Sequence, residues 1–550
     1  MSVAGRLPPE LAARVVPQEQ ALLETVRSGT RIASGFATSE PHTFYASLWD
    51  HVRDQDLTDL TITQGLFMAP HPLLVGAALE PLVELAGEPK GTSLFAGLKR
   101  EIKQAVAKAE TLQTLVAHYE ELRERRVRFV SGFLSPAVNT IVPDNVLTRS
   151  LYPEWAGRNL ARSGILSWQS VHFPDAPDAL VQDPETSRLM DADLFVLVAT
   201  PPDERGRLSH GPANGANAEA LDLALRDGKA GILLYLNTGY PFTDGHPESP
   251  NTISVEELVP AARDGRLWIV EDSGPIPALP ADAFEHPDPD EIRIAEHVVN
   301  HIEMHPQLTR GRALQVGIGG TGVLAVRRLA DSGWSGRVYT EMFEPYTMEL
   351  MERNKLAGSH FVTADGRREQ LDGKLVCTFA LGRKGDGFYE ALDRHPAVLL
   401  SAASRVVVPE AFYYGLGINN ILGIDFHGHV NSTGRDVNPH SGVGGVATIL
   451  RGLARGGVAY LCLKSTHRTP DGEERSSIFP FLPEGTPVTL IGPDLMGTRE
   501  GARTFLVTEH GIAELSARSQ ERFIRALLSV AHPDHREWLA RRAWEEFRVA

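Results

Sequence analysis

Two long runs of apolar residues mark the first half of the chain. LFVLVAT at 194–200 and AGILLYLNT at 230–238 are almost continuously apolar, as expected for strands that are buried on both faces. Between them, a polar loop rich in Pro, Gly, Ser and Asn (201–215) leads into a predicted helix from about Ala216. Strand, helix and strand in this order predict a parallel sheet, and ligands of such sheets bind where the strands end. The loop at 201–215 is therefore a candidate ligand-binding segment.

The second half of the chain repeats this alternation. A helix is predicted at 291–304. The stretch Gly311–Pro345 is typical of a strand, a glycine turn, an amphipathic helix, a short turn and a second strand that ends in Glu341. Farther along, the apolar stretch 398–408 predicts another strand. Both halves thus favour the α/β class.

A segment rich in Pro, Asp and Ala at 271–291 separates the two halves and is typical of a linker. A chain of 550 residues is also longer than one hydrophobic core usually serves. We therefore expect an N-terminal domain at 1–275, a linker at 276–290 and a C-terminal domain at 291–550.

The glycine turn of the second half supports two hypotheses. GIGGTG at 317–322 satisfies G-x-G-x-x-G, and Glu341 follows about 20 residues on, where the ribose-binding acid of a dinucleotide site belongs. Alternatively, Glu341 is a nucleophile and the glycines belong to a coenzyme A site. The apolar neighbours Met342 and Phe343 would partly desolvate the carboxylate, which makes it less stable as an anion and more reactive.

A second glycine loop, SGVGG at 441–445, comes directly before a predicted helix. Glycines at the start of a helix let the backbone approach a ligand closely, and the free amides can bind an anion or an oxyanion. A tight turn packed on a neighbouring strand explains the same residues equally well. Asn419 lies in a polar turn before this loop, where an asparagine often satisfies the turn backbone.

Composition narrows the classes of protein further. Hydrophobic residues make up 42% and charged residues 23%, which is ordinary for a globular protein, and the formal charge of −16 argues against nonspecific nucleic-acid binding. Two cysteines are too few for a disulfide framework, and neither a signal peptide nor an apolar run of about 20 residues is recognisable. We expect a cytoplasmic protein without a membrane span. His427-Gly-His429 has no accompanying ligand set, so no metal is expected.

Beyond these patterns, the chain resembles the acetyl-CoA hydrolase/transferase family. This family comprises the class I CoA-transferases, among them 4-hydroxybutyrate CoA-transferase and succinyl-CoA:acetate CoA-transferase. Single segments are weak signals, but their occurrence in the family's order along most of the chain is specific. The matching segments are ATPPDERGRLSHG (199–211), LQVGIGGTGVLAV (314–326), VYTEMFEP (338–345), CTFALG (377–382), GHVNSTG (428–434), SGVGGVATILRGLARGG (441–457), VTEHGIAEL (507–515) and AHPDHREWL (531–539).

The resemblance implies two related α/β domains of the CoA-transferase type, with mainly parallel sheets and the active site in the cleft between the domains. It makes Glu341 the catalytic glutamate. It also implies that coenzyme A binds against residues of both glycine loops and a nearby asparagine: Gly317, Gly319, Gly320, Asn419, Gly442, Gly444 and Gly445.

The chain departs from the family's pattern in two places. Family members commonly have an aspartate and a glycine soon after the catalytic segment, whereas this chain has Glu344-Pro345-Tyr346. The segment 243–258 is also longer than usual. Both departures leave the nucleophile in place and leave the acyl substrate open.

The activity implied is transfer of coenzyme A from an acyl-CoA to a small carboxylic acid by a ping-pong mechanism through a glutamyl-CoA thioester on Glu341. No tightly bound cofactor is expected, and a homodimer or a higher homo-oligomer is implied by the resemblance alone. An acyl-CoA hydrolase, in which water discharges the same thioester, is the near alternative. An NAD-dependent dehydrogenase and a non-catalytic CoA-binding sensor are more distant ones.

Overall fold

The chain divides into two compact units in its computed structural model. The first unit comprises Met1–Gly91, Phe95–Ala283 and Thr378–Ser404, and the second comprises Thr92–Leu94, Phe284–Cys377 and Arg405–Ala550. The structure describes residues 3–68, 71–78, 109–131, 133–134, 166–168, 171–176, 190–279, 287–317, 319–434, 442–469, 472–496, 499–515 and 519–549.

The first unit is built on a seven-stranded sheet whose strands pair in parallel throughout. Its strand order is β11 (Leu267–Asp272), β9 (Gly231–Asn237), β7 (Leu194–Ala199), β1 (Arg31–Ser34), β2 (Thr61–Gln64), β4 (Arg128–Ser131) and β6 (Leu166–Trp168). The two apolar runs of the sequence are the neighbouring strands β7 and β9, and every residue of both strands is buried. The predicted parallel sheet is confirmed.

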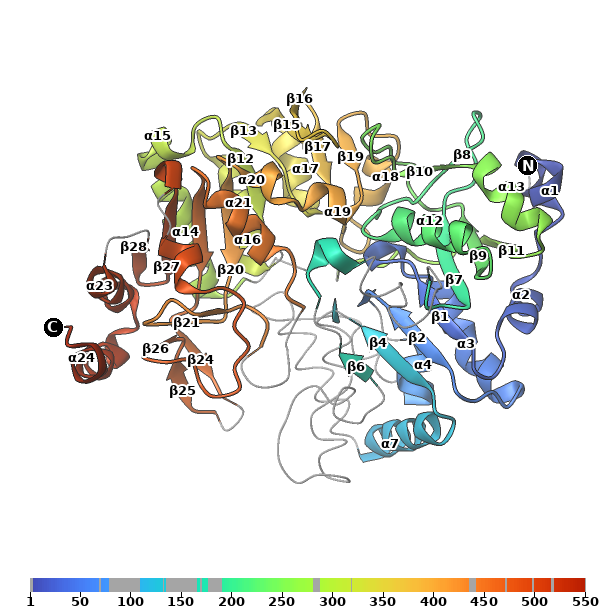
Figure 1. Ribbon diagram of the computed structural model, residues 1–550, viewed down its shortest axis with the longest axis horizontal. Helices are drawn as coiled ribbons and strands as arrows, with labels where there is room; N and C mark the ends of the chain where they lie inside the picture. The colour runs from blue at the N-terminus through green and yellow to red at the C-terminus, as the bar shows by residue number, and fades with distance from the viewer. Residues whose placement is uncertain are drawn as a thin grey trace. The chain divides into compact units, whose positions relative to one another are not determined.

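Helices cover both faces of this sheet, which explains why its central strands are apolar without alternation (Figure 1). Val196 and Val198 belong to one hydrophobic cluster, together with side chains of helix α3 (His42–Asp54). Phe195 and Leu197 belong to a second cluster. That cluster also contains side chains of α12 (Asn217–Asp227) and α13 (Val255–Arg263). Successive residues of β7 therefore belong alternately to two hydrophobic clusters, one on each face of the sheet.

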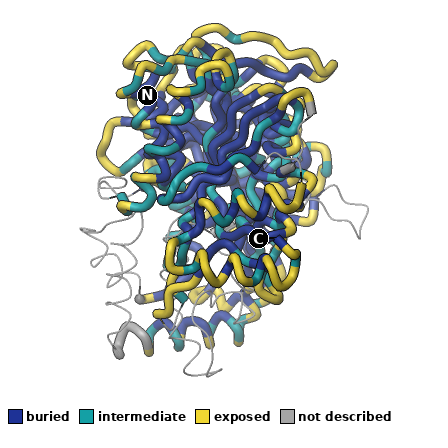
Figure 2. The backbone as a smooth tube through the Cα atoms, turned by 90° about the vertical axis from the view of Figure 1, so that its left-hand side faces the viewer, coloured by how far each residue is buried: buried dark blue, intermediate teal, exposed yellow. Residues whose placement is uncertain are grey.

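The second unit contains an eight-stranded sheet with a parallel centre and antiparallel edges. Its order is β16 (Arg368–Asp372), β15 (Leu356–Val362), β13 (Gly336–Val338), β12 (Ala313–Val316), β20 (Leu416–Asn420), β23 (Val458–Cys462), β27 (Arg503–Thr508) and β28 (Gly511–Glu514). Strand β23 and the greater parts of β20 and β27 are buried. The buried core of the chain is dark blue in Figure 2. Parallel strands of this kind end at a common edge, which places their C-terminal turns side by side.

Three helices of the second unit matter for its chemistry. Helix α14 spans Pro289–Met304, which confirms the helix expected at 291–304, and α16 spans Gly320–Asp331 directly after the glycine turn. Helix α21 spans Val446–Leu453 after the second glycine loop. Among the described residues, no helix combines the length and the apolar character that crossing a membrane requires.

The strand expected at 398–408 is only partly present. Strand β19 covers Val398–Leu400, and the chain then turns into the short helix α19 (Ala403–Val406). Ala403 donates its backbone N–H to the carbonyl of Gly215 at 2.7 Å, so this stretch bonds to a loop rather than continuing a ladder. The prediction was wrong for the second half of the stretch because apolar residues in a short run do not distinguish a buried strand from a buried helical turn.

Candidate active site

The glycine turn follows β12 and lies against the end of the neighbouring strand β20. Gly317 donates its backbone N–H to Ile418 at 2.8 Å, and a Cβ at Gly317 would lie only 2.7 Å from the Oδ1 of Asn419. The buried Asn419 amide pairs with Gln315, donating at 3.0 Å and accepting at 3.3 Å. The structure thus brings together two of the predicted coenzyme-binding positions, and glycine at 317 permits the close approach.

The next two glycines are equally crowded. Gly319 has φ +145°, and a Cβ there would lie 2.1 Å from the Nδ2 of Asn420. At Gly320, the first residue of α16, a Cβ would lie 2.7 Å from the Oε2 of Glu291. The start of α16 therefore faces the carboxyl group of Glu291. Burial raises the pKa of this carboxyl. In a dinucleotide site, the pyrophosphate binds at this position, the N-terminus of the helix. Because Glu291 occupies it here, the structure argues against the dehydrogenase hypothesis.

Glu341 lies close to the same turn because its segment is bonded to β12. Tyr339 donates its backbone N–H to Leu314 at 2.8 Å, and the Thr340 hydroxyl donates to the carbonyl of Val316 at 3.2 Å. The Tyr339 hydroxyl also donates to Val406 at 2.6 Å. These bonds hold the residues before Glu341 on both sides, and Glu341 itself is only 6% exposed.

The second glycine loop supplies a direct partner for this carboxylate. A hydrogen bond joins the Gly445 backbone to Glu341, and a Cβ at Gly445 would lie 2.2 Å from the Oε1 of Glu341. Gly445 is the N-cap residue of α21, so its amide points out of the start of a helix, where partial positive charge gathers. Gly442 and Gly444 belong to the same loop, and Gly444 has φ +64°, while Ser441 lies outside the described residues.

Burial dominates the electrostatics of Glu341. Desolvation raises the pKa of its carboxyl from 4.5 to about 7, and the hydrogen bond from Gly445 opposes this rise without cancelling it. Met342 and Phe343 are both buried, which fits the apolar flank expected from the sequence. The carboxyl is thus poised to lose its proton near neutral pH.

Glu344 and Pro345, where the chain departs from the family's pattern, form the start of helix α17 (Pro345–Glu352). The buried Glu344 carboxylate accepts hydrogen bonds from the backbone N–H groups of Tyr346 at 2.7 Å and Thr347 at 2.9 Å. The Thr347 hydroxyl donates to it at 2.5 Å. Glu344 is therefore a helix cap, and the proline directly after it was the sequence signal for this role.

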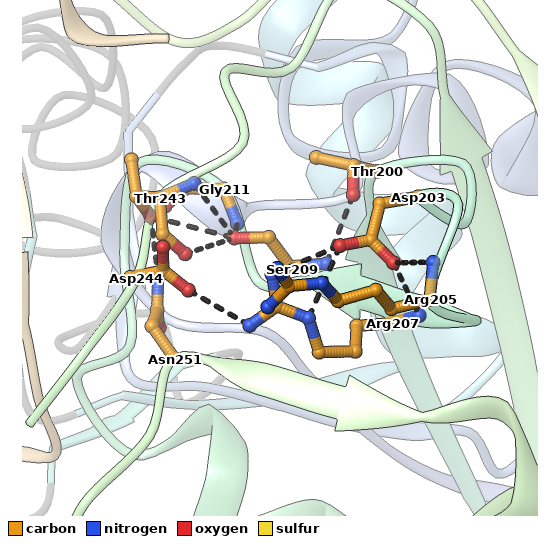
Figure 3. Close-up of polar contacts among 9 residues, drawn as sticks. All are labelled: Thr200, Asp203, Arg205, Arg207, Ser209, Gly211, Thr243, Asp244 and Asn251. Atoms are coloured by element: carbon orange, nitrogen blue, oxygen red, sulfur yellow. Dashed lines mark hydrogen bonds and ion pairs between the residues drawn. The ribbon is translucent and has the colours of Figure 1, made fainter. Parts of the chain in front are cut away.

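The polar loop of the first unit, after β7, is held together by its own charges (Figure 3). The Asp203 carboxylate accepts from the backbone of Arg205 and Arg207 and pairs with the Arg207 guanidinium at 2.9 Å. Ser209 donates to the carbonyl of Thr243 at 2.8 Å and accepts from its N–H at 3.0 Å. The described contacts of Asp203, Arg207 and Ser209 thus hold this loop in a defined shape.

The buried Glu341 should make the stability of the protein depend on pH. A carboxyl whose pKa rises from 4.5 to about 7 on folding costs the folded state about 3 kcal/mol above pH 7. This cost is absent below pH 4.5, where the carboxyl is neutral in both states. It grows between pH 4.5 and 7, where the unfolded state loses the proton before the folded state does, and it is complete above pH 7. Glu341→Gln removes the titration but keeps an oxygen that can accept from Gly445.

In urea denaturation, Glu341→Gln should therefore be more stable than the unchanged protein at pH 8 by about 3 kcal/mol. At pH 4.5 the two proteins should unfold at similar urea concentrations, which makes the acidic measurement the internal control. A stability difference that stays constant between pH 4.5 and 8 would contradict the raised pKa.

Comparisons with known proteins identify what the chain and its fold are similar to. A sequence model of the acetyl-CoA hydrolase/transferase C-terminal domain matches residues 385–543. A butyryl-CoA:acetate CoA-transferase from Anaerostipes caccae is 27% identical over 64% of this chain and 71% of its own length. A 4-hydroxybutyrate coenzyme A transferase from Clostridium kluyveri is 29% identical over 52% of this chain and 67% of its own length.

The crystal structure of RipA from Yersinia pestis superposes on the whole chain with a TM-score of 0.67 at 21% identity and covers 100% of both chains. At this identity, the superposition establishes the fold. Together with the sequence matches, it confirms the expected two-part α/β architecture with largely parallel sheets. Residues 385–543 thus match the C-terminal domain of the acetyl-CoA hydrolase/transferase family, and much of the chain is similar to enzymes named as CoA-transferases.

Proposed function

We propose that the protein is a CoA-transferase that moves coenzyme A from an acyl-CoA to a small carboxylic acid, with Glu341 as the nucleophile. The observation that carries the proposal is a buried glutamate whose carboxyl is hydrogen-bonded to the backbone of Gly445, the N-cap residue of helix α21. The relatives named as CoA-transferases support the reaction class.

The proposed reaction begins with attack on the thioester. One carboxylate oxygen of Glu341 adds to the acyl carbonyl carbon, the carbon–sulfur bond breaks, and coenzyme A leaves as a thiolate. The product on the enzyme is a mixed anhydride. The thiolate then adds to the glutamyl carbon and expels the acyl group as a free carboxylate, which leaves a glutamyl-CoA thioester. A second carboxylic acid takes up coenzyme A by the reverse sequence, so the kinetics are ping-pong.

The environment of Glu341 suits both halves of this reaction. The carboxyl loses its proton near pH 7, and a carboxylate removed from water reacts more readily because no hydration shell must be shed. During attack on the glutamyl carbon, negative charge develops on the glutamyl oxygen. The Gly445 amide, at the N-terminus of α21, is placed to stabilise that charge.

The coenzyme is proposed to bind along the two glycine loops. Gly317, Gly319 and Gly320 follow β12, and Gly442 and Gly444 precede Gly445. Asn419 lies in the neighbouring β20, one residue before its end. Because Glu291 lies against Gly320, we assign the uncharged pantetheine part of coenzyme A to this turn. Both exchanged partners are carboxylic acids, so the proposed steps need no change of oxidation state.

Acyl-CoA hydrolysis is the second candidate, because the family's description names both activities. The two reactions share every step up to the glutamyl-CoA thioester. They differ in whether water or a carboxylate discharges it.

Gly445→Ala should strongly impair turnover while the protein still folds. The φ of −93° at this position suits alanine, but the new Cβ would meet Glu341 at 2.2 Å and Val407 at 2.9 Å. We expect kcat to fall by about 10²-fold because the carboxylate must move. Gly333→Ala is the matched control, since nothing lies within 4 Å of its added Cβ. Equal activities in the two variants would contradict the contact.

Release of coenzyme A from butyryl-CoA, measured with and without acetate, tests the activity itself. A transferase should release coenzyme A slowly alone and form acetyl-CoA rapidly when acetate is present, with the parallel lines of ping-pong kinetics. Glu341→Gln should lose at least about 10³-fold in kcat, because no nucleophile remains. Fast release that acetate does not change would favour the hydrolase, and full activity of the variant would exclude Glu341 as the nucleophile.

A further inference from the structure

A valine side chain borders the carboxyl group of Glu341. A Cβ added to Gly445 would lie 2.2 Å from the Oε1 of Glu341 and 2.9 Å from the Cγ1 of Val407, so both atoms border one point at the start of α21. The distance between these two atoms cannot exceed the sum of those two values. A water molecule between them would need more room, because its oxygen keeps about 2.8 Å from a hydrogen-bonded oxygen and roughly 3.5 Å from a carbon. Val407 is itself buried, so its methyl group occupies a place that water could otherwise take.

Val407 lies in the short connection between α19 and α20 (Pro409–Phe412). Helix α20 packs closely on α21, because a Cβ at Gly452 would lie 2.3 Å from the carbonyl oxygen of Pro409 and 2.7 Å from the Cβ of Phe412. Glycine at position 452 of α21 permits this approach. The connection that carries Val407 is therefore held against the helix that begins after Gly445.

The Tyr339 side chain joins the same connection to the segment of Glu341. Its hydroxyl donates to the carbonyl of Val406 at 2.6 Å, and Val406 directly precedes Val407. Its ring meets that of Phe412 in α20 edge-on, at a centroid distance of 5.6 Å. Tyr339 is buried, and a buried hydroxyl without a partner is costly, so the bond to Val406 is strongly favoured. The hydroxyl of Tyr339 thus fixes the position of Val407 relative to Glu341.

We propose that Val407 keeps water away from the Glu341 carboxyl, and that Tyr339 is a positioning residue that acts on Val407 through Val406. Desolvation has the largest effect on the pKa of Glu341 and raises it to about 7, which agrees with an apolar neighbour at Oε1.

The consequence for the reaction rests on the proposed role of Glu341 as nucleophile. In hydrolysis, water adds to the glutamyl carbon of the thioester and the carbon–sulfur bond breaks. One proton of the water goes to the sulfur of coenzyme A, the other goes to solvent, and the Glu341 carboxylate is restored. A thioester that water reaches poorly persists until a carboxylic acid arrives, so Val407 should favour transfer over hydrolysis.

Other ionisable groups lie on the elements around Glu341. Burial keeps three of them uncharged at neutral pH, because it lowers the pKa of the histidine to about 3 and raises the pKa of the other two: His360, Tyr339 and Cys377. The charged groups are Glu344, Arg405 on α19, Glu410 on α20 and Arg451 on α21. Glu410 and Arg451 are exposed, and Glu344 caps α17. None of these groups is altered in the variants below except Tyr339.

Unfolding in urea tests the inference without relying on any activity. Glu341→Gln is made in the unchanged protein and in a Val407→Ala background, and the stability gap within each pair is followed from pH 4.5 to 8. In the unchanged protein, the gap should grow until about pH 7. With Val407→Ala, water reaches the carboxyl, so the gap should level off at least about one pH unit lower. Tyr339→Phe should shift it in the same direction by a smaller amount.

Val458→Ala is the matched control. Val458 is also buried, but it lies at the start of β23, whereas the glycine turn follows the other end of the parallel strands. This variant should lose stability and leave the pH dependence of the gap unchanged. An unchanged gap in Val407→Ala, or an equal shift in Val458→Ala, would overturn the proposal. Should Val407→Ala fail to fold, Val407→Thr decides, because it keeps the size and puts a hydroxyl near the carboxylate, which should also lower the pKa.

Release of coenzyme A from butyryl-CoA supplies the second readout. In Val407→Ala, release without acetate should rise at least about tenfold relative to the formation of acetyl-CoA with acetate. A shifted gap with an unchanged ratio would overturn the consequence for hydrolysis. Full activity of Glu341→Gln would instead refute the proposed function, while the stability gap would still decide whether Val407 keeps water from this carboxyl.

Discussion

The candidate site of the second unit depends on the burial of one carboxylate, that of Glu341. Glu341 is removed from water beside apolar neighbours, and the Gly445 amide at the start of α21 bonds to it. A buried carboxyl with its pKa near 7 costs about 3 kcal/mol when ionised, which is a large part of the usual stability of a folded domain. Such a cost persists only where the surrounding structure fixes the group, and the bonds from Tyr339 and Thr340 to β12 do so.

The glycines around this carboxylate share one physical role, which is to admit neighbouring groups. A Cβ at Gly317 would meet Asn419, one at Gly320 would meet Glu291, and one at Gly445 would meet Glu341 itself. A turn with the G-x-G-x-x-G spacing is thus compatible with a site that is not a dinucleotide site. The acid beside Gly320 is what distinguishes the two, since it occupies the helix end where a pyrophosphate would bind.

Much of the fold could be predicted from the sequence. Strands that are buried on both faces, such as β7 and β9, are continuously apolar and are therefore recognisable. The candidate residues Glu341 and Gly445 were also recognisable from their local segments. Their contact was not, because it joins positions more than a hundred residues apart and nothing in either segment encodes the pairing. The contact between Glu291 and Gly320 was not recognisable either, because neither local segment encodes it. The capping role of Glu344 was readable from the proline after it but was obscured by the comparison with the family's pattern.

Mass spectrometry of the charged enzyme is the most direct measurement of the central claim. The protein is incubated with butyryl-CoA, quenched in acid and digested with trypsin, and the peptide that begins at Val338 carries Glu341. The account predicts coenzyme A joined to Glu341 with loss of one water, and release of this adduct when acetate is added before quenching. An adduct on another residue, or sustained turnover in which Glu341 is never modified, would contradict it.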